Sequence, residues 1–522
     1  MNGDRLQIFI AMFIYVAVVI AIGVLFARRA SSSSKNYLIG GRSLGPWVTA
    51  MGAEASDMSG WLLMGLPGVA YWAGLSEAFW TAIGLLIGTY LNWLIVAKRL
   101  RNYTAVAQDS ITIPDFLSNR FKEKKKVIAL IAALFILVFF TAYASSCFVA
   151  VGKLFSALFG TSYLYMMIAG AIFVILYTFV GGFLAESASD FMQGIVMIIS
   201  LVVVLTVGTI KAGGLPEVIR NAKEIPGFFE FFGVAQPVVN ANGVQQIEAG
   251  KPLFGQAGTY GFLTVISTLS WGLGYFGMPQ VLLKFMAIRD PEQLKLSRRV
   301  ATIWCAVSLT AAVVIGLMGR IIYPDVLLTS SDAENIFIHM SVEFFPPLLA
   351  GIVMAGILAA TISSSDSYLL IAASAVSKTI YHGIVKKDAT DKQVLGMSRL
   401  VLVLVAVCAM ALAVDENSII FQVVAFAWAG FGATFGPIML FSLFWKRVNR
   451  TGAIAGMVTG GVMVFIWKMI VRRFIGGILD IYELFPAFVF SCIAIVIASL
   501  LSEKPSAEIE EEFEKAKAYK AG

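Results

Sequence analysis

The sequence predicts an all-α protein that crosses a membrane about thirteen times. Hydrophobic residues make up 59% of the 522 residues and charged residues only 14%, with a mean hydropathy of +0.84. Soluble domains carry about 25% charged residues, so this composition excludes an ordinary globular protein. Apolar runs of roughly 20 residues, the length that crosses a bilayer, recur along the chain and are separated by mostly short polar segments.

The apolar runs divide the chain into one integral membrane domain, residues 1–502, and a charged tail, residues 503–522. We expect the tail to be a solvated cytoplasmic helix or a disordered end. The run near 336–379 is too long for one straight crossing, so part of it is expected to form a loop helix before the crossing. The predicted spans lie near residues 6–27, 45–74, 76–97, 127–158, 163–183, 190–211, 259–286, 299–322, 336–379, 398–414, 418–444, 451–471 and 482–501.

The positively charged residues predict the orientation of the chain in the membrane. They concentrate in segments 28–42, 98–126, 284–299, 378–399 and 446–450, which all fall on one side of the predicted topology. The positive-inside rule makes this side cytoplasmic, which places the N-terminus outside and the C-terminus inside. Arg472 and Arg473 are exceptions on the outer side. The same distribution accounts for the net charge of +7 without a nucleic-acid partner.

The second span contains the stretch Ser56–Gly68 (SDMSGWLLMGLPG), which is unusual for a membrane helix. Its glycines and Pro67 weaken the helix repeatedly, and in transporters such interruptions expose backbone groups that bind ions and substrates. A glycine-lined packing face is the alternative. That alternative does not explain Asp57, because an ionisable residue inside a bilayer costs at least about 2.5 kcal/mol. We therefore predict a broken helix that forms part of a binding site.

A similar interrupted stretch, Trp271–Pro279 (WGLGYFGMP), lies in the seventh span, five spans after the span that contains Ser56–Gly68. Broken helices at corresponding positions of two five-helix blocks are typical of inverted-repeat transporters, so we predict core repeats at about 45–211 and 259–444. Trp271 and Tyr275 are four residues apart, which places them on one helix face as a wall of the binding site. Their alternative role is that of interfacial aromatic anchors.

The ninth span contains Thr361–Ser367 (TISSSDS), in which five hydroxyl residues and one carboxylate crowd an otherwise apolar helix. A single Ser or Thr in such a helix usually donates a hydrogen bond to the carbonyl four residues earlier. A cluster of this density indicates instead an oxygen-lined cation site. Oxygen ligands select hard cations, and neither His nor Cys lies nearby to favour a transition metal.

Enzymatic function finds little support in the sequence. It contains no nucleophile–His pairing, HExxH motif, P-loop or Rossmann fingerprint, and only two histidines. An ion channel could also use hydroxyl- and carboxylate-lined helices, but no repeated pore loop is visible. The sequence therefore predicts a secondary transporter rather than an enzyme.

At these stretches the chain resembles the sodium:solute symporter family. The resemblance implies a LeuT-like core of two inverted five-helix repeats and a multi-pass protein of a bacterial inner membrane. It also implies uptake of L-proline driven by inward sodium flux through alternating access, with another small zwitterion or carboxylate as the alternative solute. The matching segments, between Tyr37 and Lys504, are Gly40–Pro46, Ser56–Gly68, Thr112–Asp115, Trp271–Gly277, Trp428–Gly432 and Gly436–Pro437.

The resemblance also assigns roles to individual residues. The sodium ion would be held by backbone oxygens of Ala55, Met58 and Ala360 and by the hydroxyls of Ser363 and Ser364, with Asp57 beside them. The carboxylate of proline suits free N–H groups at a half-helix end, and its ammonium and ring suit aromatic side chains. The implied proline site consists of Ser59, Trp61, Tyr143, Trp271, Tyr275 and Pro279.

Further residues bear on the number of cations and on selectivity. Asp190, Asp366 and Ser367 lie where some members of the family build a second sodium site, although Asp190 could instead cap the start of the sixth span. Met278 stands where similar symporters carry a polar residue, which could alter selectivity near Pro279. The expected partners are sodium, the solute and the lipid bilayer, with no nucleic acid and no obligate protein partner.

Overall fold

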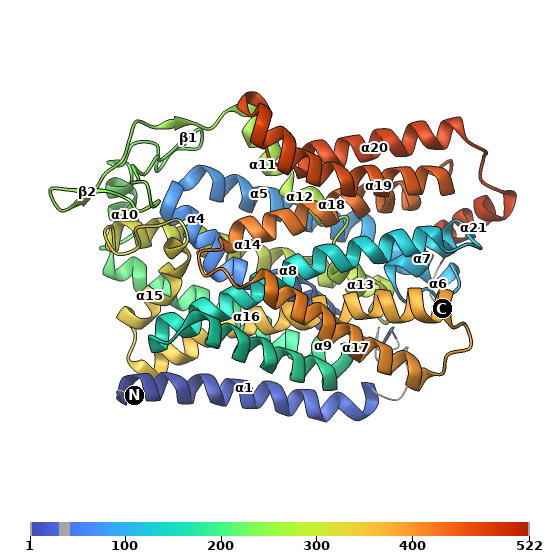
Figure 1. Cartoon of the computed structure of the whole chain (residues 1–522), viewed down its shortest axis with the longest axis horizontal. Coiled ribbons are helices and arrows are strands. Elements are labelled where there is room, and N and C mark those ends of the chain that lie inside the picture. Colours follow the sequence, from blue (N-terminus) through green and yellow to red (C-terminus); the bar gives the residue numbers. More distant parts are fainter. Residues whose placement is uncertain (1–2, 31–41, 520–522) are drawn as a thin grey trace.

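The computed structural model describes residues 3–30 and 42–519, and its regular structure is almost entirely helical. The long helices lie side by side along one direction (Figure 1). Within the described residues, ten helices are long and apolar enough to cross a membrane. The predicted all-α polytopic fold is confirmed, whereas the count of thirteen spans remains a prediction. The predicted motif residues Gly40 and Gly41 and the basic Lys35 lie outside the described residues.

The chain forms the following elements in order, with η marking π- and 3₁₀-helical segments. They are α1 (Gly3–Ala30), α3 (Pro46–Asp57), η2 (Trp61–Gly65), α4 (Leu66–Ala73), α5 (Leu75–Leu91), η3 (Asn92–Val96), α6 (Ala97–Val106), α7 (Ile113–Arg120), α8 (Val127–Phe159), α9 (Tyr163–Lys211), α10 (Leu215–Ala222), β1 (Gly233–Val234), β2 (Ile247–Glu248), β3 (Lys251–Pro252), β4 (Gly258–Thr259), α11 (Phe262–Leu269), α12 (Trp271–Gly274), α13 (Pro279–Ala287), η4 (Pro291–Gln293), α14 (Leu294–Ile322), η5 (Asp332–Asn335), α15 (Ile336–Phe344), α16 (Pro347–Ser374), η6 (Ala375–Val385), α17 (Asp391–Leu412), α18 (Ile420–Phe444), α19 (Arg450–Ile466), η7 (Trp467–Ile475), η8 (Gly477–Leu479), α20 (Leu484–Leu501) and α21 (Ala507–Ala518).

The second predicted span is interrupted where the sequence indicated. Helix α3 ends at Asp57, and the chain resumes as the π-helical η2 and then α4. At the break the amide of Ser59 donates to the carbonyl of Asp57 (3.0 Å) instead of the Ala55 carbonyl four residues earlier. This irregular backbone leaves polar groups available inside an apolar bundle, as a binding site requires.

The seventh predicted span is also interrupted, and it comprises α11, α12 and α13. Its second break lies at residues 275–278, and Pro279 occupies the first turn of α13, where no intrahelical N–H is needed. The glycines here serve close packing as well, because a Cβ at Gly272 would collide with the backbone of Gly84 on α5. The broken segment therefore lies directly against its neighbour, backbone to backbone.

Helix α9 differs from the sequence prediction. The chain turns sharply at Gly182 (φ 62°, ψ −177°), and the sixth crossing begins there rather than near residue 190. Asp190 therefore lies inside a helix, and the alternative that it caps the start of the span is wrong. The polar residues that made this segment look like a loop are buried and find partners within the bundle. The predicted loop helix is confirmed as α15, which precedes the crossing helix α16.

Helices α16 and α18 form the centre of the bundle, and α1 lies at its edge. The membrane-length window is 83% buried in each of the two central helices and 22% buried in α1. Large apolar side chains are exposed on the outer helices, including Phe13, Leu25 and Leu404. Such a surface suits a lipid environment rather than water.

The connection between α9 and α11 is ordered. It contains α10 and, among the described residues, two small antiparallel sheets, β1 with β4 and β2 with β3. These strands lie at the end of the bundle where α1 begins, whereas α6, α7 and α21 lie toward the opposite end (Figure 1). This arrangement agrees with an outer loop and an inner basic face, although the orientation in a membrane remains a prediction.

The charged tail forms the helix α21, which packs against α6 instead of being fully solvated. Phe513 is 5% exposed, with the guanidinium groups of Arg99 and Arg120 over its ring at 5.1 and 5.4 Å. Lys122 forms an ion pair with Glu512 at the same contact. The tail is therefore an amphipathic helix whose apolar face covers part of the basic end of the bundle. The division of the chain at residue 502 remains a prediction.

Candidate transport site

The first break and the hydroxyl-rich helix meet in the centre of the bundle. The Ser364 hydroxyl on α16 donates to the Ala55 carbonyl on α3 across 3.4 Å. This bond joins two segments more than 300 residues apart, and both belong to the predicted sodium ligands. All the predicted ligands are at most 1% exposed apart from Asp57, which is 3% exposed: Ala55, Met58, Ala360, Ser363 and Ser364.

The neighbouring hydroxyl, Ser363, has a different partner. It donates to Oδ1 of Asp190 on α9 across 2.6 Å. Ser365 and Thr361 bond back to carbonyls of their own helix, as isolated hydroxyls in apolar helices do. The hydroxyl cluster therefore divides into side chains that reach other helices and side chains that do not.

Asp57 connects the two broken segments. Its Oδ1 accepts a hydrogen bond from the Gln280 amide on α13 across 3.1 Å. The Tyr143 hydroxyl on α8 donates to the Asp57 backbone carbonyl across 3.3 Å. Gln280 was not predicted from the sequence, although its position one residue after Pro279 places it at the start of the half-helix.

Aromatic rings cluster between the two breaks. Trp61 and Trp271 lie 5.5 Å apart between ring centroids, and Phe421 lies 5.9 and 5.4 Å from them. The Trp61 indole N–H has no hydrogen-bond partner among the described residues, although Trp61 is only 3% exposed. A buried donor without a partner is costly, so this group would gain from a polar ligand.

The other predicted substrate residues are only partly brought together. Tyr143 stacks on Tyr368 with a centroid distance of 4.3 Å, and Tyr275 packs edge-on against Trp428 at 5.0 Å. Ser59 lies in the first break beside Trp61, whose amide donates to its hydroxyl across 3.3 Å. Pro279 instead lines a small separate cavity on the side of α7.

A cavity of about 600 Å³ leads toward these rings from one end of the bundle. Trp271 and Phe421 line it together with Tyr482, which stacks on Trp271 at 5.1 Å. Tyr482 is fixed by its hydroxyl, which donates to the Ala425 carbonyl across 2.8 Å. Ser59, Trp61, Tyr143 and Tyr275 are not among the residues lining the cavity and are at most 3% exposed. Of the predicted proline site, Trp271 is therefore the residue that borders this cavity.

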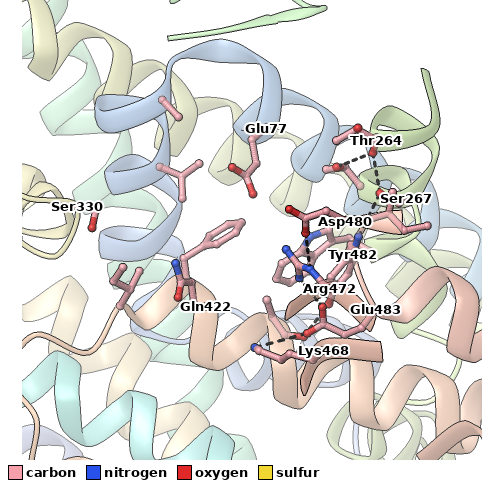
Figure 2. A pocket seen from close by; sticks show the side chains of 18 of the residues that line it. Glu77, Thr264, Ser267, Ser330, Gln422, Lys468, Arg472, Asp480, Tyr482 and Glu483 are labelled. Atoms are coloured by element: carbon pink, nitrogen blue, oxygen red, sulfur yellow. Dashed lines mark hydrogen bonds and ion pairs between the residues drawn. The ribbon is translucent and has the colours of Figure 1, made fainter. Parts of the chain in front are cut away.

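Charged side chains gather along this cavity, as Figure 2 shows. Arg472 forms ion pairs with Asp480 and Glu483, both at 2.8 Å, and Lys468 lies 3.5 Å from Glu483. The positive charge of Arg472, a predicted exception to the positive-inside rule, is thus balanced by carboxylates of the segment that follows. Figure 2 places Glu77 and Gln422 on other walls of the same cavity.

Glu334, on η5 at the cavity wall, holds the start of α18. Its carboxylate accepts the backbone N–H groups of Ile420 (3.0 Å) and Phe421 (2.9 Å) and pairs with the Lys153 ammonium at 2.8 Å. Burial raises the pKa of the Glu334 carboxyl, although the Lys153 ammonium opposes this shift. A carboxylate at a helix N-terminus stabilises the helix, so this contact positions Phe421 above the predicted site.

A second buried charge cluster adjoins the predicted sodium ligand Ser363 through Asp190. The Lys284 ammonium on α13 contacts Glu186 (3.0 Å), the Ser187 hydroxyl (2.9 Å) and Asp190 (2.9 Å). Ser367 donates to Glu186. Both carboxylate oxygens of Asp366 lack a hydrogen-bond partner among the described residues. The sequence placed Lys284 among the basic residues of the cytoplasmic side and did not single out Glu186, whereas the structure buries both inside the bundle, where they pair with each other.

Replacing Ser364 by alanine is expected to weaken the apparent sodium affinity by about 10- to 150-fold. A hydrogen-bonding group facing a charged ligand contributes about 1.5–3 kcal/mol. Sodium titration of solute uptake into proteoliposomes measures the change. The matched control is Ser365→Ala, because Ser365 is equally buried but its hydroxyl donates a hydrogen bond to the Thr361 carbonyl of its own helix. Equal losses in both variants would contradict the assignment of Ser364 as a ligand.

Two helices broken at corresponding places in two blocks, with polar groups converging on the breaks, define a secondary transporter. The chain belongs to the sodium:solute symporter family, whose sequence model matches residues 37–460. It is 39% identical over 510 residues to a sodium/proline symporter of Escherichia coli (strain K12), covering 97% of this chain and 95% of that protein. It is 40% identical over 514 residues to a sodium/proline symporter of Staphylococcus aureus (strain USA300 / TCH1516), covering 98% and 95%.

Solved structures confirm the fold. A sodium-coupled sialic acid symporter in a substrate-bound, outward-open state superposes with a TM-score of 0.76 at 17% identity, covering 96% of this chain and 99% of that one. MhsT in complex with L-phenylalanine superposes with a TM-score of 0.51 at 13% identity, covering 88% and 98%. The chain therefore has the LeuT-like architecture that the family resemblance implied, and it is a multi-pass membrane protein.

Proposed function

We propose that this chain is a symporter that couples inward sodium flux to the uptake of L-proline across a bacterial inner membrane. Relatives about 40% identical over nearly the whole of both chains are named sodium/proline symporters. Its work is transport without chemical change of the solute, so we do not assign it an enzymatic activity. Sodium, proline and the bilayer are its proposed partners.

The sodium ion is proposed to bind at the first break. Its ligands are the carbonyl oxygens of Ala55, Met58 and Ala360 and the hydroxyls of Ser363 and Ser364, with the Asp57 carboxylate supplying negative charge nearby. The observation that carries this assignment is the 3.4 Å contact between the Ser364 hydroxyl and the Ala55 carbonyl. It brings an oxygen of each helix close together, so a cation coordinated by both oxygens would replace this hydrogen bond as the link between the helices.

The solute is proposed to bind between the two breaks. The proline site comprises Ser59, Trp61, Tyr143, Trp271, Tyr275 and Pro279. The unpaired Trp61 indole N–H offers a donor to the proline carboxylate, and the Trp61–Trp271 pair offers apolar and cation–π surface to its ring and ammonium. Pro279 lines a different cavity, so its contribution requires the second half-helix to move.

The proposed coupling follows from the short distance along the chain between the two sets of ligands. Ala55 and Met58 precede Ser59 and Trp61 in a single break, so ordering this segment for sodium also orders it for proline. Each ligand then raises the affinity for the other by the same factor, because coupling is reciprocal. Asp57 contributes by tying the first break to α13 through Gln280.

Uptake of radiolabelled proline into proteoliposomes, with the external cation varied, tests the proposal. We expect uptake to require an inward sodium gradient and to stop when the gradient is collapsed. Uptake that is equally fast in potassium would contradict sodium coupling. Competition by a panel of amino acids, imino acids and osmolytes tests the solute, and Met278 at the start of α13 is the residue to exchange if another zwitterion competes better.

Asp190, Asp366 and Ser367 are proposed to line a second position for a cation, beside the sodium site. They lie on α9 and α16, next to the proposed sodium ligands Ser363 and Ser364.

A further inference from the structure

The Lys284 ammonium lies in a cage of oxygen atoms. Nζ contacts Glu186 Oε1, Ser187 Oγ and Asp190 Oδ2 at 2.9–3.0 Å, and it lies 4.6 Å from the centre of the Phe183 ring. The side chain is 1% exposed. Three oxygens and an aromatic face around a cation, all shielded from water, form a complete coordination shell for an ammonium group.

The same contacts use up most of the ligands that a second metal ion would need. Asp190 accepts Ser363 at Oδ1 and Lys284 at Oδ2, and the Ser367 hydroxyl is directed to Glu186. Of the predicted second-site residues, only Asp366 retains oxygens without a hydrogen-bond partner in the part of the chain that the structure describes. A hard cation requires several oxygen ligands, so one carboxylate is not a sufficient site.

We propose that the Lys284 ammonium is the permanent occupant of the second cation position, so that the chain binds a single sodium ion. This inference rests on the proposed function, because it takes the sodium site at Ala55 and Ser364 as given. A positive charge fixed beside the carboxylates repels a further cation and satisfies the oxygens that would bind it. Removing the ammonium would release Asp190 and Glu186, which with Asp366 would form a second site for a monovalent cation.

The position of Lys284 in the fold gives this cation a further property. It lies on α13, directly after the second break, whereas its partners lie on α9. Lys284 also lies against the first broken segment, because a Cβ built at Gly52 on α3 would be 3.4 Å from its Nζ. An ion bound here would leave in every transport cycle, but the lysine is covalently attached and moves only with its half-helix. It therefore supplies the charge of a second ion without adding to the sodium transported.

The test counts bound sodium ions on the purified full-length protein with radioactive sodium and, separately, the sodium dependence of proline uptake. We expect the wild type to bind about one sodium ion per chain with a Hill coefficient near 1, since this coefficient is limited by the number of sites. Lys284→Met is expected to bind about two ions per chain, with a Hill coefficient above 1. Lys284→Arg keeps the positive charge and is expected to bind one.

Lys153→Met is the matched control, because Lys153 is also buried (6% exposed) and paired with a carboxylate, Glu334, away from this cluster. We expect it to leave the sodium count at one. Two sodium ions on the wild type would overturn the inference without any variant. A folded Lys284→Met protein that still binds one ion would also overturn it. Absence of sodium binding by the wild type would instead contradict the proposed function.

Discussion

Replacing Asp57 by asparagine is expected to lower the apparent sodium affinity of proline uptake by about 30- to 1000-fold. Removing one partner of a buried, hydrogen-bonded charge costs about 2–4 kcal/mol. Asp57 is 3% exposed and lies at the break of α3, and its carboxylate accepts the Gln280 amide across 3.1 Å. Asparagine keeps the size of the side chain but removes the charge that attracts sodium. Initial uptake rates at varied external sodium measure the effect.

Glu54→Gln is the matched control for this substitution. Glu54 lies on the same helix one turn earlier, is 1% exposed, and accepts the Trp93 indole N–H across 3.3 Å. Its neutralisation changes a buried carboxylate that is not at the break, so we expect a much smaller change in sodium affinity. If the two variants shift the sodium dependence equally, charge in α3 in general, rather than Asp57 at the break, determines sodium binding.

Replacing Gly277 by alanine is expected to reduce proline uptake by about 5- to 150-fold. A Cβ at Gly277 would lie 2.7 Å from the Gly436 amide nitrogen and would also collide with the Phe431 carbonyl, both on α18. Backbone atoms cannot move aside as a side chain can, and overpacking of this kind costs about 1–3 kcal/mol. The cost falls on the conformation in which the second break contacts α18. Initial uptake rates and thermal unfolding of the purified protein measure the loss.

Gly261→Ala provides the control on the same broken segment. Gly261 precedes α11 with φ −71°, and a Cβ there would meet nothing within 4 Å. We expect its uptake and unfolding temperature to match those of the wild type. Normal transport by the Gly277 variant would show that the second break separates from α18 throughout the transport cycle.

The paired breaks could be predicted from sequence because their signals are local. Several glycines, Pro67 and Asp57 within a few residues are atypical of an uninterrupted membrane helix. In the structure the helix is broken at Met58 and Ser59. The same local reasoning applied to Pro279, which starts α13. The juxtaposition of Ala55 with Ser364 required the family resemblance, because no local pattern indicates which distant helix meets a break.

The contacts between distant segments could not be predicted. The polar run before Asp190 looked like a loop, because its partners Lys284 and Ser363 lie about 90 and 170 residues further along the chain. The glycines of α12 were interpreted only as helix breakers, whereas Gly272 also allows close contact with α5. Helix α21 was expected to be solvated or disordered, because the amphipathic face of a short charged segment is a weak signal without its docking partner.

The stacking of Tyr482 on Trp271 has a consequence for observing the protein at work. Tyr482 belongs to the loop between η8 and α20, so a movement of this loop relative to α12 would change the stack on Trp271. Trp61 and Trp428 lie 5.5 and 5.9 Å from the same indole. Indole emission responds to stacking and to water, so the intrinsic fluorescence of the unlabelled protein is expected to change when this aromatic cluster rearranges.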